Sequence, residues 1–161
     1  MYFPNIAPRD ANTSHGNKNL GDLPEWDLND LYEGEDAPQL TSDLQWLEGE
    51  CAQFAQDYQN KLATLNADEL LSCIHRNEKI SAIAGRIMSF AGLRYYQMTT
   101  DSNRAKFMSD AQEKITNFTT PLVFFTLEIN RLEDGYLDTR FAQNKELARY
   151  KPVFDKIRAM K

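Results

Sequence analysis

The sequence predicts an all-α protein, and three observations lead to that prediction. Apolar residues recur at steps of three and four over long stretches, as on one face of a helix. Short polar breaks with capping residues separate these stretches. No alternating apolar and polar run of useful length indicates a β-hairpin. Because short connectors favour antiparallel neighbours, we expect a bundle or hairpin stack of three long helices followed by shorter C-terminal helices.

The chain has the size of one compact domain, with 161 residues of which 42% are hydrophobic. Residues 1–23 combine proline, glycine and asparagine with few large apolar side chains, so we expect a flexible N-terminal arm there. Residues 24–161 are predicted to form a single helical domain. At its start, the apolar side chains of Trp26–Tyr32 are expected to pack down and anchor the chain where the arm ends.

The first predicted helix begins after Asp36, a capping acid, with Pro38 in its first turn. The apolar residues that share its buried face are Leu40, Leu44, Leu47, Cys51, Phe54, Tyr58 and Leu62. Their steps of three and four residues predict one long amphipathic helix.

The second predicted helix begins after Asn66, because asparagine caps a helix well and the acids Asp68 and Glu69 suit the positive end of the helix dipole. It is expected to run to about Met98. Its apolar stripe includes Leu70, Ile74, Ile83, Ile87 and Phe90. Beside the stripe lies a row of small residues, Ala82, Gly85, Ser89 and Gly92. Such a row predicts that another helix approaches closely.

The third predicted helix follows a polar break that ends in Asp101, a capping acid. Its apolar positions are Met108, Ile115, Phe118, Leu122, Phe125, Ile129 and Leu132. Pro121 lies inside this pattern and lacks a backbone donor, so we predict a kink or local break near Thr119 and Thr120. Gly135 is expected to end the helix.

Charge is distributed unevenly along the chain. Residues 1–50 hold 11 acidic and 2 basic residues, whereas residues 51–161 hold 13 acidic and 16 basic residues. The basic C-terminal stretch, Leu137–Lys161, predicts one or two shorter helices with Pro152 as the restart point. The acidic front disfavours binding to nucleic acid or to an anionic membrane, because both require a basic protein surface.

The composition is typical of a soluble protein, with a mean hydropathy of −0.60 and 26% charged residues. No apolar run approaches the roughly 18 residues that a transmembrane helix requires. The start, Met1–Asp10, lacks the basic segment and apolar run of a secretory signal. We therefore expect a cytoplasmic location and no membrane partner.

Side chains suited to catalysis or metal binding are scarce. The only histidines are His15 and His75, and the only cysteines are Cys51 and Cys73, which we interpret as reduced packing thiols. Cys73 and His75 point about 200° apart on a helix, so they cannot hold one ion together. The sequence has no His-Glu-x-x-His, glycine-rich phosphate loop or Gly-x-Ser-x-Gly. We predict no catalytic and no metal-binding residue in this chain.

One cluster is a candidate substrate-binding site. Arg94, Tyr95 and Tyr96 come near the predicted end of the second helix, where they could face a cleft and hydrogen-bond a peptide backbone. The opposite interpretation is structural, because tyrosines at a helix end commonly bury their rings and keep their hydroxyl groups in water. The sequence leaves both interpretations open.

Three segments resemble a known enzyme family. Trp26–Tyr32 is similar to the Trp-Asp-Leu-x-Asp-Leu-Tyr opening of oligoendopeptidase F proteins, in the thimet-oligopeptidase-like metallopeptidase family. Leu93–Asp101 resembles the family's helix and turn with a tyrosine and a Thr/Ser-Asp cap, and Ala111–Leu132 resembles the long helix that follows. The resemblance covers the chain from about residue 23 to its end.

The resemblance implies that the chain is the N-terminal helical domain of a zinc-dependent oligoendopeptidase. In that family a larger C-terminal catalytic domain carries His-Glu-x-x-His and a downstream glutamate, and the bound zinc activates water for peptide hydrolysis. Those positions do not occur in this sequence. The implied partners are this missing catalytic domain, which would hold the zinc, and short peptide substrates. The isolated chain is expected to be inactive.

Two alternatives belong to other classes. A free-standing helical interaction module would accept a partner helix in a groove between its own helices. A compact enzyme in its own right would depend on Arg94, Tyr95 and Tyr96. A reading frame that continues past Lys161 into His-Glu-x-x-His would favour the peptidase domain, whereas a stop codon there would favour the interaction module.

Overall fold

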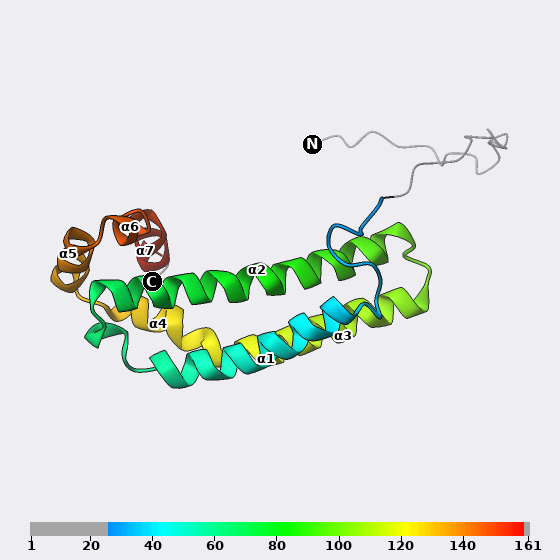
Figure 1. The fold of residues 1–161 in the computed structure, drawn as a ribbon, viewed down its shortest axis with the longest axis horizontal. Coiled ribbons are helices and arrows are strands. Elements are labelled where there is room, and N and C mark those ends of the chain that lie inside the picture. Colours follow the sequence, from blue (N-terminus) through cyan, green and yellow to red (C-terminus); the bar gives the residue numbers. More distant parts are fainter. Residues whose placement is uncertain (1–25, 160–161) are drawn as a thin grey trace, which may run out of the picture.

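A computed structural model of the protein describes residues 26–159. Its elements are α1 (Pro38–Tyr58), the short 3-10 helix η1 (Leu62–Thr64), α2 (Ala67–Gln97), α3 (Ser102–Thr119), the short 3-10 helix η2 (Thr120–Leu122), α4 (Val123–Arg131), α5 (Asp134–Gln143), α6 (Lys145–Ala148) and α7 (Lys151–Ala159). Figure 1 shows α2 antiparallel to α1 and α3 along an elongated molecule, with α5, α6 and α7 gathered at one end. The predicted all-α class is confirmed, and this part of the chain contains no β-strand.

The segment before α1, residues 26–37, lies against the C-terminal half of α2 and is called the clasp below (Figure 1). Within it, Tyr32 is only 3% exposed and packs edge-on against Phe90 of α2, with ring centroids 5.3 Å apart. Trp26, by contrast, is 62% exposed. The expectation that the large side chains of this segment pack down is therefore correct for Tyr32 and wrong for Trp26. The predicted arm at residues 1–23 lies outside the described residues.

The start of α1 agrees with the prediction at Pro38 but not at Asp36. The residue before the helix is Ala37, which has no side-chain acceptor, and Asp36 is exposed. The backbone closes the turn instead, because the Ala37 N–H donates to the carbonyl oxygen of Gly34 at 3.2 Å. Proline in the first turn needs no partner for a missing N–H group, so a side-chain cap is dispensable here.

The end of α1 differs from the prediction, because the helix ends at Tyr58 and does not reach Leu62. Asn60 has a φ of 64°, a left-handed conformation that asparagine tolerates well. Glu128 of α4 accepts hydrogen bonds from the backbone N–H groups of Asn60 at 2.5 Å and Leu62 at 3.3 Å. Leu62 is nevertheless fully buried, so its periodicity predicted its burial correctly, but the residue lies in η1 and not in the first long helix.

The start and end of α2 agree with the prediction. Asn66 Oδ1 accepts hydrogen bonds from the N–H groups of Asp68 at 3.0 Å and Glu69 at 2.9 Å, and Glu69 Oε2 accepts one from Asn66 N–H at 2.8 Å. This reciprocal capping box satisfies donors that would otherwise be free at a helix start. The helix then runs for 31 residues to Gln97.

Most of the small-residue row on α2 is not covered by another helix of the described structure. Ala82, Gly85 and Ser89 are exposed, and nothing lies within 4 Å of the position that a Cβ atom on Gly85 would take. Ile87 and Ala91 are fully buried and supply the packing face. Within residues 26–159 the prediction of a close helix approach is therefore wrong for these three exposed residues, whereas Gly92 at the end of the row is buried.

The predicted break in the third long helix is confirmed. Pro121 lies in η2, between the end of α3 at Thr119 and the start of α4. The hydroxyl groups of Thr119 and Thr120 donate to the carbonyl oxygens of Ile115 and Thr116, at 2.8 and 2.7 Å. These bonds stabilise the turn where proline cannot donate.

The predicted role of Gly135 is wrong. The helix before it, α4, ends at Arg131, where Leu132 turns to an extended conformation, and Gly135 lies in the first turn of α5. Three short helices follow where one or two were expected. Pro152 lies in the first turn of α7, as its predicted role as a restart point requires.

The core lies between the long helices and continues under the short ones. Its largest fully buried side chains are Phe54, Phe90, Phe154, Leu40, Leu47, Leu62, Leu70, Ile80, Ile87, Ile129, Leu147 and Cys51. The Phe54 ring of α1 lies 6.0 Å from the Phe124 ring and 5.7 Å from the Phe125 ring of α4, measured between centroids. This aromatic contact joins the last turns of α1 to the start of α4, which are far apart in sequence.

Arg76 links α2 to α1 at the surface. Its guanidinium donates to Glu50 Oε1 and to Asp57 Oδ2, each at 2.7 Å, and lies 5.3 Å from the centroid of the Tyr58 ring. The hydrogen bond to Glu50 raises the pKa of Arg76, and the hydrogen bond from Arg76 lowers the pKa of Asp57. The network fixes how the two helices face each other.

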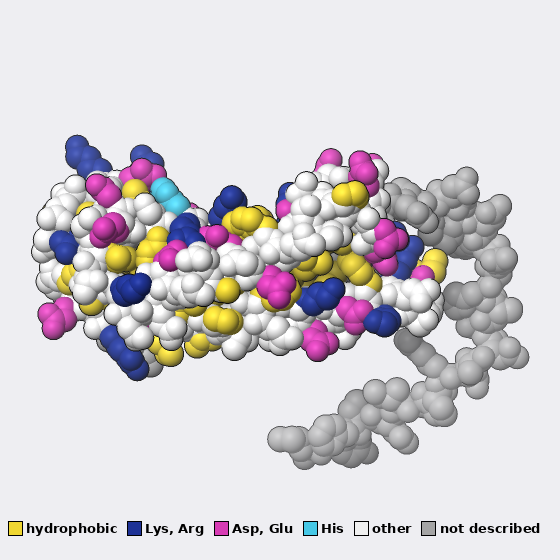
Figure 2. Space-filling model, turned by 60° about the horizontal axis from the view of Figure 1, so that its bottom comes forward, with side chains coloured by type: hydrophobic (Ala, Val, Ile, Leu, Met, Phe, Trp, Pro, Cys, Tyr) yellow, Lys and Arg dark blue, Asp and Glu magenta, His cyan; other side chains and the backbone are white. Residues whose placement is uncertain are grey.

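The surface carries charges of both signs. On the face shown in Figure 2, hydrophobic side chains form patches along the molecule, between acidic and basic side chains. No helix between residues 26 and 159 has the length and apolar character needed to cross a membrane.

Candidate functional site

The predicted cluster of Arg94, Tyr95 and Tyr96 lies in the last turns of α2. Arg94 Nε is 3.6 Å from Glu35 Oε1, and its Nη1 donates to Gln97 Oε1 at 3.3 Å. Tyr95 is half-buried and Tyr96 is 62% exposed, with ring centroids 5.4 Å apart. Arg94 lines a cavity under the clasp, whereas Tyr96 lines a separate hollow. The three side chains therefore do not converge on one cleft.

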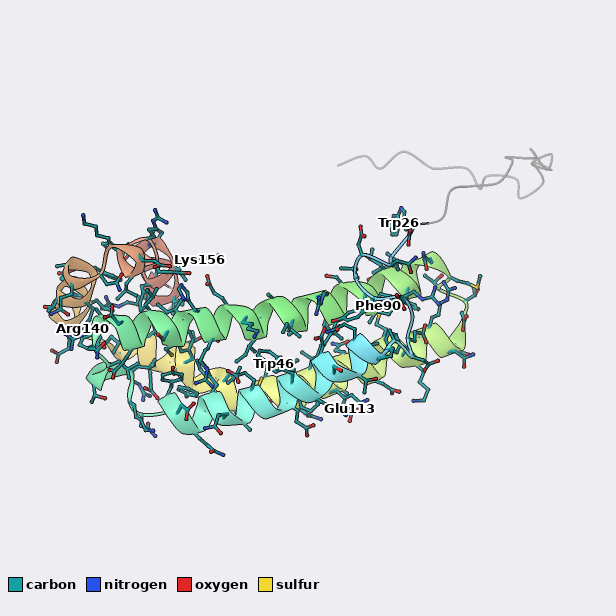
Figure 3. All side chains as sticks on the ribbon, in the orientation of Figure 1. Trp26, Trp46, Phe90, Glu113, Arg140 and Lys156 are labelled. Carbon is teal, nitrogen blue, oxygen red and sulfur yellow. The ribbon has the colours of Figure 1, made fainter. Side chains whose placement is uncertain are left out.

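The cavity at Arg94 has a volume of about 190 Å³ and lies between the clasp and the end of α2. It is lined by Trp26, Asp27, Leu28, Asn29, Tyr32, Glu33, Gly34, Phe90, Arg94 and Gln97. Figure 3 shows Trp26 at the outer edge of this end of the molecule and Phe90 on the α1 side of α2. Two of the segments that carry the peptidase resemblance thus meet at one cavity.

Contacts from α2 hold the clasp in place on both sides of the cavity. Gln97 Nε2 donates to the carbonyl oxygen of Trp26 at 2.8 Å, so the backbone of the clasp is fixed while the indole stays exposed. Asp27 Oδ1 accepts a hydrogen bond from Asn29 N–H at 3.0 Å, which shapes the turn that follows. Further along, the Arg94–Glu35 pair joins the clasp to α2 again.

A buried polar node fixes the centre of the clasp. The Tyr32 hydroxyl donates to Asp43 Oδ2 of α1 at 2.6 Å, and Gln39 Nε2 donates to Asp43 Oδ1 at 2.8 Å. Arg86 of α2 donates to the Tyr32 hydroxyl at 3.0 Å, pairs with Asp43, and lies over the Tyr32 ring. The node therefore joins the clasp, α1 and α2 through one carboxylate.

Sequence reasoning missed this node, although a signal was present. Asp43 lies three residues after Leu40 and four before Leu47, and both leucines are fully buried. An acid on the buried face of a helix needs a hydrogen-bonding partner, because an unpaired buried carboxylate is costly. The partners Tyr32 and Arg86 come from other segments, and no local pattern identifies them.

The Tyr32 phenol is expected to titrate late and to make stability depend on alkaline pH. Burial and the hydrogen bond to Asp43 raise the pKa of Tyr32 from 10.0 to about 12. Because the folded-state pKa lies above the unfolded value, the stabilisation is complete below pH 10 and is lost as pH rises through about 12. We expect the unfolding temperature to fall more steeply across this interval in the unaltered protein than in Tyr32→Phe, as measured by circular dichroism. Equal slopes would contradict the buried hydrogen bond.

The cysteines and the described histidine do not form a reactive site. Cys51 and Cys73 are free and buried, and burial raises the pKa of Cys51 to about 11 and of Cys73 to about 12. His75 is exposed and lies 3.5 Å from Glu146 Oε1. No three His, Cys, Asp or Glu side chains in residues 26–159 are grouped to hold a metal ion. His15 lies outside the described residues.

The hollow at Tyr96 has a volume of about 400 Å³ and lies over Ser89 and Gly92, the last two residues of the small-residue row of α2. Its lining residues are Met88, Ser89, Gly92, Leu93, Tyr96 and Met108. None of these residues is charged, and Met108 is supplied by α3. The hollow is thus an uncharged surface depression, distinct in chemistry from the cavity under the clasp.

Together these observations define an all-α protein in which an N-terminal clasp is pinned to two long helices and encloses a small cavity lined by aromatic, acidic and basic side chains. Comparisons of the chain with protein-family models, curated proteins and solved structures give no match.

Proposed function

We propose that this chain is the N-terminal helical domain of a cytoplasmic zinc-dependent oligoendopeptidase, similar to the thimet-oligopeptidase-like family. The observation that carries the proposal is the contact between two family-like segments, Trp26–Tyr32 and Leu93–Asp101. Gln97 Nε2 donates to the Trp26 carbonyl oxygen at 2.8 Å, and the two segments line the same cavity. Motifs that are distant in sequence and adjacent in space belong to one structural unit, so their joint occurrence supports the resemblance.

The role proposed for this chain is steric. Its residues do not fit a zinc site, because the sequence has two histidines and no His-Glu-x-x-His, and the described part has no group of metal ligands. Zinc would be held by a further catalytic domain and would supply an activated water there. The long helices α1 and α2, which the buried polar node of Tyr32, Asp43 and Arg86 joins to the clasp, would form one wall of a cleft. Such a cleft would admit short peptides and hold them in a reactive position.

A second candidate function is a helical interaction module, and the hollow on α2 favours it. Interface cores are depleted of charged residues. The hollow is lined by uncharged side chains, with Met88, Tyr96 and Met108 around Gly92. A helix of another protein could approach α2 closely over Ser89 and Gly92, which line the hollow.

Hydrolysis of a quenched fluorescent peptide of about eight residues tests the proposal. The 161-residue chain and the product of its complete reading frame are assayed side by side, each with and without a zinc chelator. We expect chelator-sensitive cleavage by the complete product and no cleavage by the 161-residue chain, because zinc catalysis requires metal ligands that this chain does not supply. Circular dichroism of the short chain confirms that its inactivity is not a failure to fold.

Two results would contradict the proposal. A reading frame that stops after Lys161, with no activity, would favour the interaction module. Chelator-sensitive cleavage by the 161-residue chain itself would place a metal site in residues that we interpret as structural.

A further inference from the structure

We propose that the outer part of the clasp, residues 26–31, is a strap that opens and closes over the cavity, while the inner part, residues 32–37, stays fixed to the helices. Gln97 is the latch that holds the strap closed. The inference concerns a motion of the chain itself and does not depend on the peptidase assignment. Three features carry it: the unequal attachment of the two parts, the orientation of the Gln97 amide, and a donor that the closed strap leaves without an acceptor.

The inner part of the clasp is attached through buried groups. The Tyr32 hydroxyl donates to Asp43 Oδ2 at 2.6 Å and accepts a hydrogen bond from Arg86 at 3.0 Å. Glu35 adds an ion pair with Arg94, with 3.6 Å between Oε1 and Nε. A segment held by buried contacts opens rarely, so this half of the clasp is the fixed end of the strap.

The outer part is attached far more weakly. Its exposed side chains are Trp26, Asp27, Asn29 and Asp30. Leu28 and Leu31 are half-buried against the edge of the core and favour the closed state. Within residues 26–159, the Trp26 carbonyl is the one group of the strap that is hydrogen-bonded to a helix, at 2.8 Å from Gln97 Nε2. The other hydrogen bonds of the strap lie within the clasp, so opening breaks a single link to α2.

Two arginines orient the latch. Gln97 Oε1 accepts hydrogen bonds from Arg94 Nη1 at 3.3 Å and from Arg104 Nη1 of α3 at 3.4 Å. The same Arg104 nitrogen donates to the Arg94 carbonyl oxygen at 3.2 Å. Because a guanidinium can only donate, the amide oxygen must face the arginines, and the amide NH₂ group then faces the Trp26 carbonyl. The start of α3 therefore sets the latch that closes the strap.

Arg94 also supplies a reason for the strap to open. Its Nε atom is buried and has no hydrogen-bond acceptor among the described residues, since Glu35 Oε1 at 3.6 Å lies beyond hydrogen-bond distance. A buried donor without an acceptor is costly. Arg94 lines the cavity that the strap covers, so opening lets water reach this donor. This gain offsets part of what opening loses at Leu28 and Leu31, as a strap that moves in both directions requires.

Alkylation of a thiol placed in the cavity wall tests the inference in the 161-residue chain. Leu28→Cys supplies the thiol, since Leu28 lines the cavity, whereas the native Cys51 and Cys73 are buried and should react slowly. Gln97→Glu, added to this background, keeps an acceptor for the two arginines and loses the donor to the Trp26 carbonyl. Iodoacetamide should then modify the introduced thiol about three- to tenfold faster, the factor by which losing one hydrogen bond shifts an equilibrium.

The matched control is Gln143→Glu in the same Leu28→Cys background. Arg140 Nη1 donates to Gln143 Oε1 at 3.3 Å at the end of α5, which repeats the arrangement of Arg94 and Gln97 without a strap. This substitution should change the alkylation rate by less than about twofold. An unchanged rate in Gln97→Glu, or an equal increase in Gln143→Glu, would overturn the assignment of the latch.

A second measurement needs no added thiol. Nitrogen-15 relaxation of Gln97→Glu should show backbone order parameters that fall towards about 0.6 in residues 27–31, whereas Ala37, which is buried in the inner part, should stay near about 0.85. An equal loss of order at Ala37 would show that the clasp moves as one unit and would overturn its division into a strap and a fixed end. Order parameters already below about 0.6 in the strap of the unaltered chain would overturn the role of Gln97 in holding it closed.

Discussion

Phe54→Ala is expected to lower the free energy of unfolding by about 3–5 kcal/mol, the range for removing a buried aromatic ring. Phe54 is fully buried, and its ring contacts those of Tyr58, Phe124 and Phe125. The substitution would leave a cavity where α1 meets α4, and the rigid helices around it cannot close it fully. Urea unfolding followed by circular dichroism measures the change.

The matched control for this prediction is Val123→Ala, also an apolar residue of the α4 region but 59% exposed. It should change stability by no more than about 0.5 kcal/mol, because little of its surface is buried. A lower urea midpoint with an unchanged slope would show that Phe54→Ala acts on stability and not on the extent of unfolding. If both variants unfold at the same midpoint, the α1–α4 contact does not contribute as described.

Features set by neighbouring residues could be predicted from the sequence. The capping box of Asn66 and Glu69 uses residues three positions apart, so it is visible in the sequence. The break around Pro121 follows from the proline itself, because its ring and missing donor act within one helical turn. The apolar periodicity of the long helices is equally local, which explains why the all-α class was predicted correctly.

Features set by distant residues could not be predicted. The end of α1 depends on Glu128, which reaches from α4 to the backbone of Asn60 and Leu62. Gly135 was interpreted as a helix stop, yet the chain turns at Leu132, whose side chain is buried. In both cases tertiary contacts decide where a helix ends, and sequence propensity carries only part of that information.

The candidate site shows the same division between local and distant information. Arg94, Tyr95 and Tyr96 are consecutive, but successive residues of a helix point about 100° apart, so adjacency in sequence does not place them in one cleft. Only Arg94 lines the cavity under the clasp. Trp26 and Glu33, which line this cavity with it, come from a segment whose position depends on the distant residues Asp43 and Gln97. A contiguous motif could therefore not identify the site.

The buried node at Asp43 is the second determinant of stability. Asp43 is 6% exposed and accepts hydrogen bonds from Tyr32, Gln39 and Arg86. Removing the acid would leave the Tyr32 hydroxyl buried without its acceptor and the Arg86 guanidinium without its counter-ion. Losing one partner of a buried pair costs more than the pair contributes when intact, because the remaining group loses both water and its partner.

Asp43→Ala is therefore expected to lower the free energy of unfolding by about 2–3 kcal/mol, below the range for fully buried pairs because water can still reach the partly exposed Arg86. Ser42→Ala, at the adjacent exposed position of α1, is the control and should cost less than about 0.5 kcal/mol. Because the node also fixes the clasp, Asp43→Ala should increase the hydrogen-exchange rate of the Tyr32 amide more than that of Asn66. A stability loss with unchanged exchange in the clasp would show that Asp43 joins α1 to α2 without positioning the cavity.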